Sequence, residues 1–287
     1  MEESYFSPQI KAPPSRLLIF VPHPDDLAIC CGGLVRHAVN NKIETHAFLM
    51  TLGGDARMPE DVFRHYGYQV TMPNDKYAAR EQIRKREAEN EALFLGLAPK
   101  ALHIGTAQSW SDIRHTAPSS INEDLSISNL SHFVPGPITQ ESVAEITQFI
   151  DRCFIPDAWI ALPLIPDKLL VHNMTSFLVT SSLISQRQDI VQNGNIVMYQ
   201  CLSSVLPSST NSEQHVLLFN EEVMSVKAKA INCHWSMRRR REEYGGYENR
   251  QNNFYDAIVR DNNEAIARSA GKAHMFGERY FLPHYTP

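Results

Sequence analysis

The sequence RLLIFVPHPDDLAICCGG, residues 16–33, decides the fold class. It opens with an apolar run of strand length, RLLIFV, that ends at Pro22, a pattern typical of a buried β-strand. Residues 32–40 fit a helix, and residues 44–51, ETHAFLMT, predict a second strand. A strand, a helix and a further strand make the unit from which parallel sheets are built.

The rest of the chain continues this alternation. Further strands are predicted over residues 101–104, 158–164, 196–202 and, at a sheet edge, 215–219, and further helices over 77–95, 138–153, 172–185, 221–241 and 254–270. The polar stretches 53–76 and 111–136 are long enough to act as lids or binding loops. We therefore expect an α/β fold with a Rossmann-like, mostly parallel sheet and helices on both faces. Because no repeat or clear linker divides the sequence, we expect a single domain over residues 1–287.

The composition excludes several kinds of partner. A formal net charge of −5 argues against nucleic acid, whose partners usually carry a basic surface. No apolar run approaches the roughly 18 residues that a membrane span requires, so we expect no membrane partner. The acidic opening MEES has no apolar signal region, which favours a cytoplasmic protein. The sequence leaves the oligomeric state open, a homo-oligomer included.

The cysteine pattern agrees with a reducing compartment. The number of cysteines is odd and none of them forms a C-x-x-C pair, so buried, reduced thiols are the simplest interpretation. Zinc ligation by these cysteines is the weaker alternative. The residues are Cys30, Cys31, Cys153, Cys201 and Cys233.

The HPDD turn, residues 22–26 with its leading proline, carries the strongest chemical signal. It follows the first strand directly, and ligands bind beyond the carboxyl ends of strands in open parallel sheets. His23 and Asp26 are close enough in this turn to converge on one cation, and imidazole and carboxylate are ordinary zinc ligands. Asp25, between them, is placed to touch a water on that cation. The alternative is a polar turn whose aspartates cap the next helix.

Further short motifs follow the turn in a characteristic order. They are Gly32-Gly33, Thr51 to Gly54 (TLGG), Arg84 to Glu87 (RKRE), Trp110 to Asp112 (WSD), Pro156 to Ala158 (PDA), Lys227 to Arg238 with His234 inside it, and Gly277 to Tyr280 (GERY). Together with HPDD, this series resembles the PIG-L/LmbE-type zinc-dependent N-acetylglucosamine deacetylases over most of the chain. The resemblance implies an LmbE-like fold and Zn²⁺ as the cofactor.

The resemblance also implies a third metal ligand. The family supplies it from the last histidine of an H-x-D-H segment, and His172 falls at that position here. On its own, such a histidine is more often a helix cap or a surface residue. His23, Asp26 and His172 would leave a fourth position open, which is the arrangement of catalytic zinc. Leu169 replaces the first histidine of the segment, so activity, proton donor or substrate would differ from those of the family.

The function that this resemblance implies is removal of an N-acetyl group from an N-acetylated amino sugar or amino-sugar conjugate. Zinc would activate water, and Asp25 would act as the general base. Arg84 and Asp112 would hold sugar hydroxyls; their alternatives are a helix-surface charge and a loop cap. Two other functions stay open. One is an amidase of the same chemistry that acts on a thiol conjugate or an antibiotic precursor. The other is a catalytically silent sugar-binding homologue, which Leu169 keeps open and the intact HPDD turn argues against.

Overall fold

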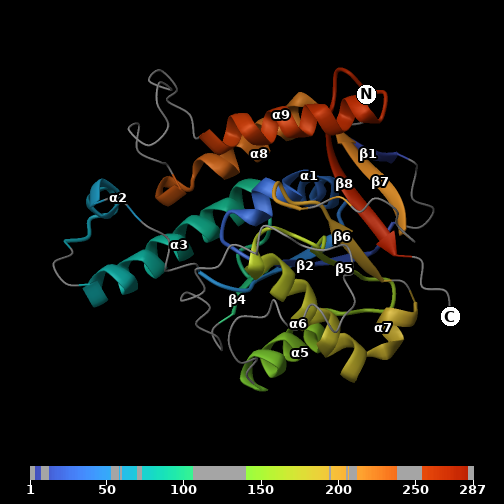
Figure 1. The fold of residues 1–287 in the computed structure, drawn as a ribbon, viewed down its shortest axis with the longest axis horizontal. Coiled ribbons are helices and arrows are strands. Elements are labelled where there is room, and N and C mark those ends of the chain that lie inside the picture. Colours follow the sequence, from blue (N-terminus) through green and yellow to red (C-terminus); the bar gives the residue numbers. More distant parts are fainter. Residues whose placement is uncertain are drawn as a thin grey trace.

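The computed structural model describes residues 4–7, 13–52, 58, 60–69, 73–105, 140–193, 195–204, 206, 212–237 and 254–283. Within these residues the strands form one eight-stranded mixed sheet in the order β1-β7-β8-β6-β5-β2-β3-β4 (Figure 1). The strands are β1 (Ser4–Ser7), β2 (Arg16–Val21), β3 (Glu44–Leu49), β4 (Leu102–Ile104), β5 (Trp159–Pro163), β6 (Ile196–Tyr199), β7 (Ser212–Phe219) and β8 (Phe276–Pro283).

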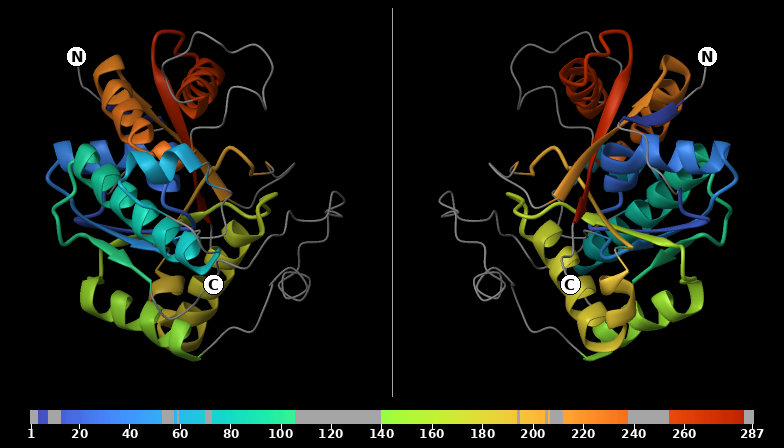
Figure 2. Two further views of the ribbon diagram at one scale, coloured as in Figure 1. Left: turned by 90° about the vertical axis from the view of Figure 1, so that its left-hand side faces the viewer. Right: turned by 90° about the vertical axis from the view of Figure 1, so that its right-hand side faces the viewer.

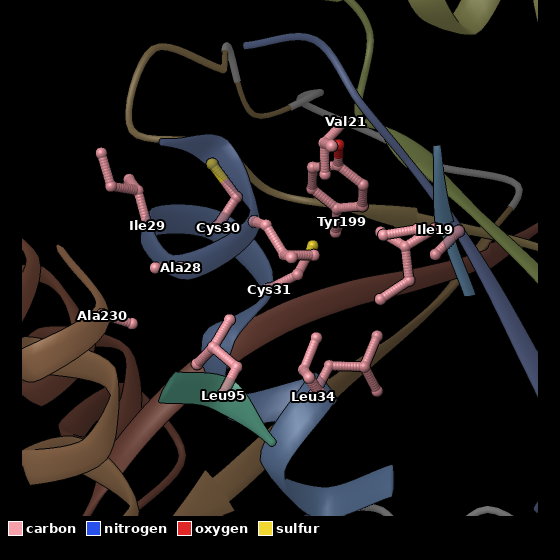
Figure 3. Close-up of a cluster of buried hydrophobic side chains, with 14 of the residues drawn as sticks. Ile19, Val21, Ala28, Ile29, Cys30, Cys31, Leu34, Leu95, Tyr199 and Ala230 are labelled. Carbon is pink, nitrogen blue, oxygen red and sulfur yellow. The ribbon is translucent and has the colours of Figure 1, made fainter. Parts of the chain in front are cut away.

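Helices cover both faces of this sheet, as the sequence predicts. The helices are α1 (Asp26–Asn40), α2 (Glu60–His65), α3 (Pro73–Leu95), α5 (Gln140–Cys153), α6 (Leu170–Gln186), α7 (Gln188–Gln192), α8 (Glu221–Asn232) and α9 (Phe254–Ser269), with a 3-10 turn at Trp235–Met237. Alternate residues of β2 face opposite layers. Leu17, Ile19 and Val21 pack against α1, whereas Leu18 and Phe20 pack against α5 and α6. Figure 2 shows the two helical layers from the sides of the molecule, and Figure 3 shows the core between α1 and the sheet.

The sheet has a parallel half and an antiparallel half. The pairs β2–β3, β2–β5, β3–β4 and β5–β6 are parallel. The pairs β1–β7, β7–β8 and β6–β8 are antiparallel, and neither β1 nor β8 is predicted by the sequence. Apolar periodicity therefore identifies the parallel strands and β7, and it misses β1 and β8. The predicted edge position of the strand at 215–219 is wrong, because β7 lies between β1 and β8.

The helix after the HPDD turn begins earlier than predicted. α1 starts at Asp26 rather than Gly32, because the turn itself closes into the helix: the Asp26 backbone N–H donates to the His23 carbonyl at 3.2 Å. Gly32 and Gly33 therefore lie in the middle of α1. A Cβ at Gly33 would come within 2.5 Å of the Phe219 ring, so glycine is needed here for close helix–sheet contact.

A buried ion pair fills the space beside these glycines. Glu278 of β8 accepts hydrogen bonds from the backbone N–H groups of Gly33 (2.8 Å) and Leu34 (3.0 Å). Its carboxylate also pairs with Lys227 of α8, whose ammonium lies 2.5 Å away. Three of the motifs noted in the sequence thus meet at one point, which ties α1 to the C-terminal strand and to α8.

Other boundaries differ from the sequence prediction for local reasons. Residues 53–76, expected to form a loop, include α2 and the first turn of α3, because Met58, Val62 and Phe63 bury apolar side chains. α8 ends at Asn232, whereas the predicted helix continued to residue 241. The stretch 111–136 lies outside the described residues. Among the helices that are described, none is both long and apolar enough to cross a bilayer.

Candidate active site and metal centre

In the HPDD turn, the side chain of Asp26 folds back toward His23. Asp26 Oδ2 accepts from the His23 backbone N–H at 2.9 Å and lies 3.1 Å from His23 Nδ1. Parallel strand β2 ends just before this turn, so both side chains lie at the carboxyl edge of the sheet. The side chain of His23 is 25% exposed and that of Asp26 only 9%. The cluster is therefore open to solvent on the His23 side.

His172 reaches the same point from the first turn of α6, which follows the neighbouring strand β5. Its Nε2 lies 3.3 Å from Asp26 Oδ2, and its ring centroid lies 5.4 Å from that of His23. Ligand atoms of His23, Asp26 and His172 all lie within 4.8 Å of one another. The structure thus brings together the three residues expected to bind metal.

Electrostatics in this cluster favour the charged forms. Burial alone would raise the pKa of Asp26, but the charge and hydrogen bonds of His172 and His23 hold it well below its usual range. Burial alone would lower the pKa of His172, but Asp26 and Asp167 raise it well above the usual value. A carboxylate and two imidazoles that lie this close together can all bind one divalent cation directly.

Asp167 is a residue that the sequence reasoning missed. It is fully buried, and its Oδ2 lies 3.3 Å from His172 Nδ1, on the ring edge away from Asp26. Ser203 and Ser204 donate to its two carboxylate oxygens at 2.6 and 2.9 Å. A carboxylate behind a ligand histidine fixes the ring orientation and leaves the other nitrogen for metal. The only sequence signal was an aspartate five residues before His172.

Cys201 offers a second set of donors beside His172, but a poorer one. Asp167, His172 and Cys201 also lie within 4.8 Å of one another. Burial raises the pKa of the Cys201 thiol to about 12, so it stays protonated at neutral pH and is a weak metal ligand. The open set that includes His23 is the better candidate.

Asp25 contacts α3 through one of its two carboxylate oxygens. Its Oδ1 accepts from Arg84 at 3.2 Å, and both residues are buried. Arg84 also donates to Ser236 Oγ at 3.2 Å and to the Leu52 carbonyl at 3.4 Å. The structure therefore places Arg84, predicted to contact substrate, behind Asp25, with 2% of its surface exposed. Asp112, the other predicted substrate contact, lies outside the described residues.

The Arg84 guanidinium belongs to a larger buried polar network. Glu87 Oε1 accepts from the Ser236 backbone N–H at 2.7 Å and from Tyr66 at 2.9 Å, and its other oxygen accepts from the Ser236 hydroxyl. Glu87 and Ser236 bind each other across 149 positions of sequence, so the sequence did not identify them as site residues. The network holds Arg84 at the position where it meets Asp25.

His234 and Glu91 extend this network beneath α1. His234 is buried, with its ring nitrogens 3.7 Å from Glu87 and 3.6 Å from Glu91. Glu91 accepts from the Ala28 backbone N–H at 2.6 Å, in the first turn of α1. Burial raises the pKa of Glu91 to about 7. The pKa of His234 is raised well above its usual value by Glu91 and its other partners, which outweigh the effect of burial.

Solved structures with this fold include several hydrolases and one hydratase. N,N'-diacetylchitobiose deacetylase from Pyrococcus horikoshii has a TM-score of 0.58 and 16% identity, over 95% of this chain and 88% of that chain. 4-Carboxy-2-hydroxymuconate hydratase from Pseudomonas putida has a TM-score of 0.58 and 13% identity, over 95% and 98%. A zinc-inhibited form of teicoplanin deacetylase has a TM-score of 0.57 and 15% identity, over 93% and 97%. At such identities the likeness shows the fold alone.

Sequence comparison gives one curated relative and one family. A glucosamine-6-phosphate deaminase-like protein of Bacteroides thetaiotaomicron is 40% identical over 101 residues, which is 31% of this chain and 15% of that protein. The chain thus spans only a small part of the length of that relative. The family model PIG-L, GlcNAc-PI de-N-acetylase, matches residues 18–179, more than half of the chain. The match includes the HPDD turn, Arg84 and His172, and the chain belongs to the PIG-L family.

Proposed function

We propose that this chain is a zinc-dependent hydrolase that removes the acetyl group from an N-acetylated amino sugar or amino-sugar conjugate. The observation that carries the proposal is the state of His172. Its side chain is 2% exposed, and its two ring nitrogens lie 3.3 Å from the carboxylates of Asp26 and Asp167, at the long limit of hydrogen bonding. A buried imidazole between two carboxylates, one of which also contacts a second histidine, is a set of donors that suits a divalent cation.

The donors around His172 suit zinc. His23, Asp26 and His172 would supply two imidazoles and one carboxylate, and the exposed side of the cluster leaves room for a further ligand. Asp167 would hold the His172 ring from behind. Zinc supplies a Lewis acid that activates water at neutral pH.

Asp25 is the general base in this proposal. Arg84 occupies its Oδ1, and among the described residues no donor reaches Oδ2, which is left to take a proton from the attacking water. The same carboxyl group then returns the proton to the departing amine. Arg84 positions Asp25. We also propose that Arg84 and Asp112 contact the substrate.

The rim of the site favours a conjugate over a free sugar. Leu169 and Leu202 are each 38% exposed, and they lie on adjoining segments, since the Lys168 N–H donates to the Ser203 carbonyl at 3.2 Å. Two large exposed apolar side chains beside a polar site suit an apolar part of the substrate. We therefore expect a bulkier N-acetylated conjugate to be turned over faster than free N-acetylglucosamine. We also propose that residues 1–287 act as one domain, supported by the single sheet.

The test combines metal analysis with product analysis on the purified chain. We expect one zinc per chain and release of both amine and acetate from a panel of N-acetylated sugars and conjugates. Asp26→Ala should lose the metal. Asp25→Asn should keep it and lose on the order of a hundredfold or more in rate, as removal of a general base does.

Asp157→Asn is the matched control, because Asp157 is exposed at the start of β5, at the opposite edge of the sheet. It should keep both metal and rate. Metal without any turnover would favour the silent sugar-binding homologue. Turnover only of thiol conjugates or antibiotic precursors would favour the alternative amidase, and a product without free amine or acetate would refute hydrolysis of an amide.

A further inference from the structure

A second group of metal-ligating side chains lies on a different part of the sheet. His46 of β3, His103 of β4 and Cys153 at the end of α5 bring their ligand atoms within 4.8 Å of one another. His46 pairs with Leu18 in the first half of β2, whereas the HPDD turn follows the last residue of that strand. His46 also shares its face of the sheet with Phe48, whose cluster packs under α5 and α6. The group is therefore separate from the candidate active site.

The ring of His46 is oriented for a ligand. Its Nε2 lies 2.9 Å from Glu44 Oε1, and a carboxylate can only accept here, so Nε2 is the donor and Nδ1 is the nitrogen that a metal would use. Nδ1 is buried and has no hydrogen-bond partner among the described residues. A carboxylate that fixes the tautomer while the other nitrogen faces inward is the arrangement found behind metal-binding histidines.

The ring of His103 lies beside that of His46. Its Nε2 is also buried and without a partner in the described part of the chain. The two rings are 5.9 Å apart at an angle of 33°. Arg152 donates to His103 Nδ1 at 3.1 Å, so Nε2 holds the proton until metal binds. Ligation through Nε2 moves that proton to Nδ1 and displaces Arg152, whose side chain is exposed and free to turn into solvent.

Cys153 supplies the third donor. It is 4% exposed, and its backbone carbonyl accepts from Arg16 at 2.7 Å, which holds the end of α5 over β2. Arg16 in turn pairs with Glu44, so the carboxylate behind His46 is itself held in place. Ligand atoms around tetrahedral zinc lie roughly 3.3–3.8 Å apart, so binding needs a contraction of only about 1 Å.

We propose that His46, His103 and Cys153 form a second metal site, one that contains a thiolate and binds a soft divalent cation such as Zn²⁺. Binding releases the thiol proton of Cys153 to solvent and joins Sγ and the two imidazoles to one ion. The ion would tie the short edge strand β4 to β3 and to the end of α5. We assign it a structural role because the group lies on the packed face of the sheet under α5, away from the HPDD turn, and a water would fill the fourth position that three side chains leave.

Cobalt titration tests this proposal on the full chain. A Co²⁺–thiolate bond gives an intense near-ultraviolet charge-transfer band, and the His23, Asp26 and His172 set contains no sulfur. We expect the metal-free protein to bind two equivalents of Co²⁺ and to develop this band. Cys153→Ser and His46→Gln should each abolish or strongly weaken the band and lower the stoichiometry by one.

Two controls separate this site from the active site. Cys233→Ser removes a thiol that donates to the Glu87 carbonyl, away from the cluster, and should leave the band unchanged. Asp26→Ala should also keep the band, whatever happens to the other equivalent. His46→Gln leaves Cys153 in place, so it decides the case if Cys153→Ser fails to fold. Absence of the band in the unaltered protein, or its persistence in both variants, would overturn the proposal.

Discussion

Replacing Lys227 by methionine should destabilise the protein more than any substitution of an exposed lysine. Lys227 is fully buried, Glu278 is 3% exposed, and their charged groups lie 2.5 Å apart. The variant keeps the length of the side chain. Among the described residues it leaves the Glu278 carboxylate with neutral donors alone, namely the Gly33 and Leu34 amides and Tyr280. Removing one partner of a buried ion pair typically costs about 3–5 kcal/mol.

That loss is a large part of the roughly 5–15 kcal/mol that stabilises a domain. With a urea dependence of about 3 kcal/mol per molar, the unfolding midpoint should fall by about 1–2 M. The assay is urea unfolding followed by fluorescence and far-ultraviolet circular dichroism. Lys229→Met is the matched control, because Lys229 lies on the exposed side of the same helix and should change stability by no more than about 0.5 kcal/mol.

A double variant isolates the buried charge as the cause. Lys227→Met combined with Glu278→Gln removes both charges and keeps an oxygen acceptor for the two α1 amides, so it should be more stable than Lys227→Met alone. Unfolding of Lys227→Met at the same urea concentration as Lys229→Met would refute a cost for the unpaired buried carboxylate. A double variant no more stable than Lys227→Met alone would refute it as well.

Three further predictions concern the site and the core. Asp167→Asn should weaken metal binding by about 10–100-fold, measured by competition with a chelator, because the His172 ring loses its charged support; unchanged affinity would exclude this role. Burial raises the pKa of Glu91 from 4.5 to about 7, so the folded protein keeps a proton that the unfolded chain releases, and stability should fall as the pH rises through that window. Glu91→Gln should flatten this fall by up to about 3 kcal/mol in urea unfolding at several pH values, and an equally steep fall in the variant would contradict it. Gly33→Ala should lower the thermal stability by about 1–3 kcal/mol, because its Cβ would come within 2.5 Å of the Phe219 ring; an unchanged melting temperature would show that the ring yields.

The parallel half of the sheet could be predicted because its strands carry their own signal. The run at residues 16–21 matches β2 residue for residue, since a strand buried on both faces is apolar throughout. β8 gives no such signal, because it contains Glu278, Arg279 and a glycine. Its buried glutamate is stabilised by an ion pair with Lys227. The two residues are 51 positions apart in the sequence, so no local pattern encodes their pairing.

The candidate site likewise contains some residues that a local pattern predicts and others that depend on distant segments. The HPDD turn places His23, Asp25 and Asp26 by local geometry, and the sequence predicted all three from the turn itself. His172 required the family resemblance, because its position depends on how α6 meets the neighbouring strand. Residues that hold others in place, such as Asp167 and Ser236, could not be predicted, because a buried polar partner is recognised only when its surroundings are known.

The contact between Glu278 and the amides of α1 has a consequence for synthesis on the ribosome. The chain emerges from its N-terminus, so the helix that begins at Asp26 is translated long before its anchor, which follows Gly33 by 245 residues. Until β8 emerges, the apolar face of α1 lacks part of its covering, and the nascent protein is a substrate for chaperones during that interval. A premature stop codon just before β8 would therefore yield a polypeptide that contains every proposed metal ligand and yet lacks the carboxylate that binds the α1 amides.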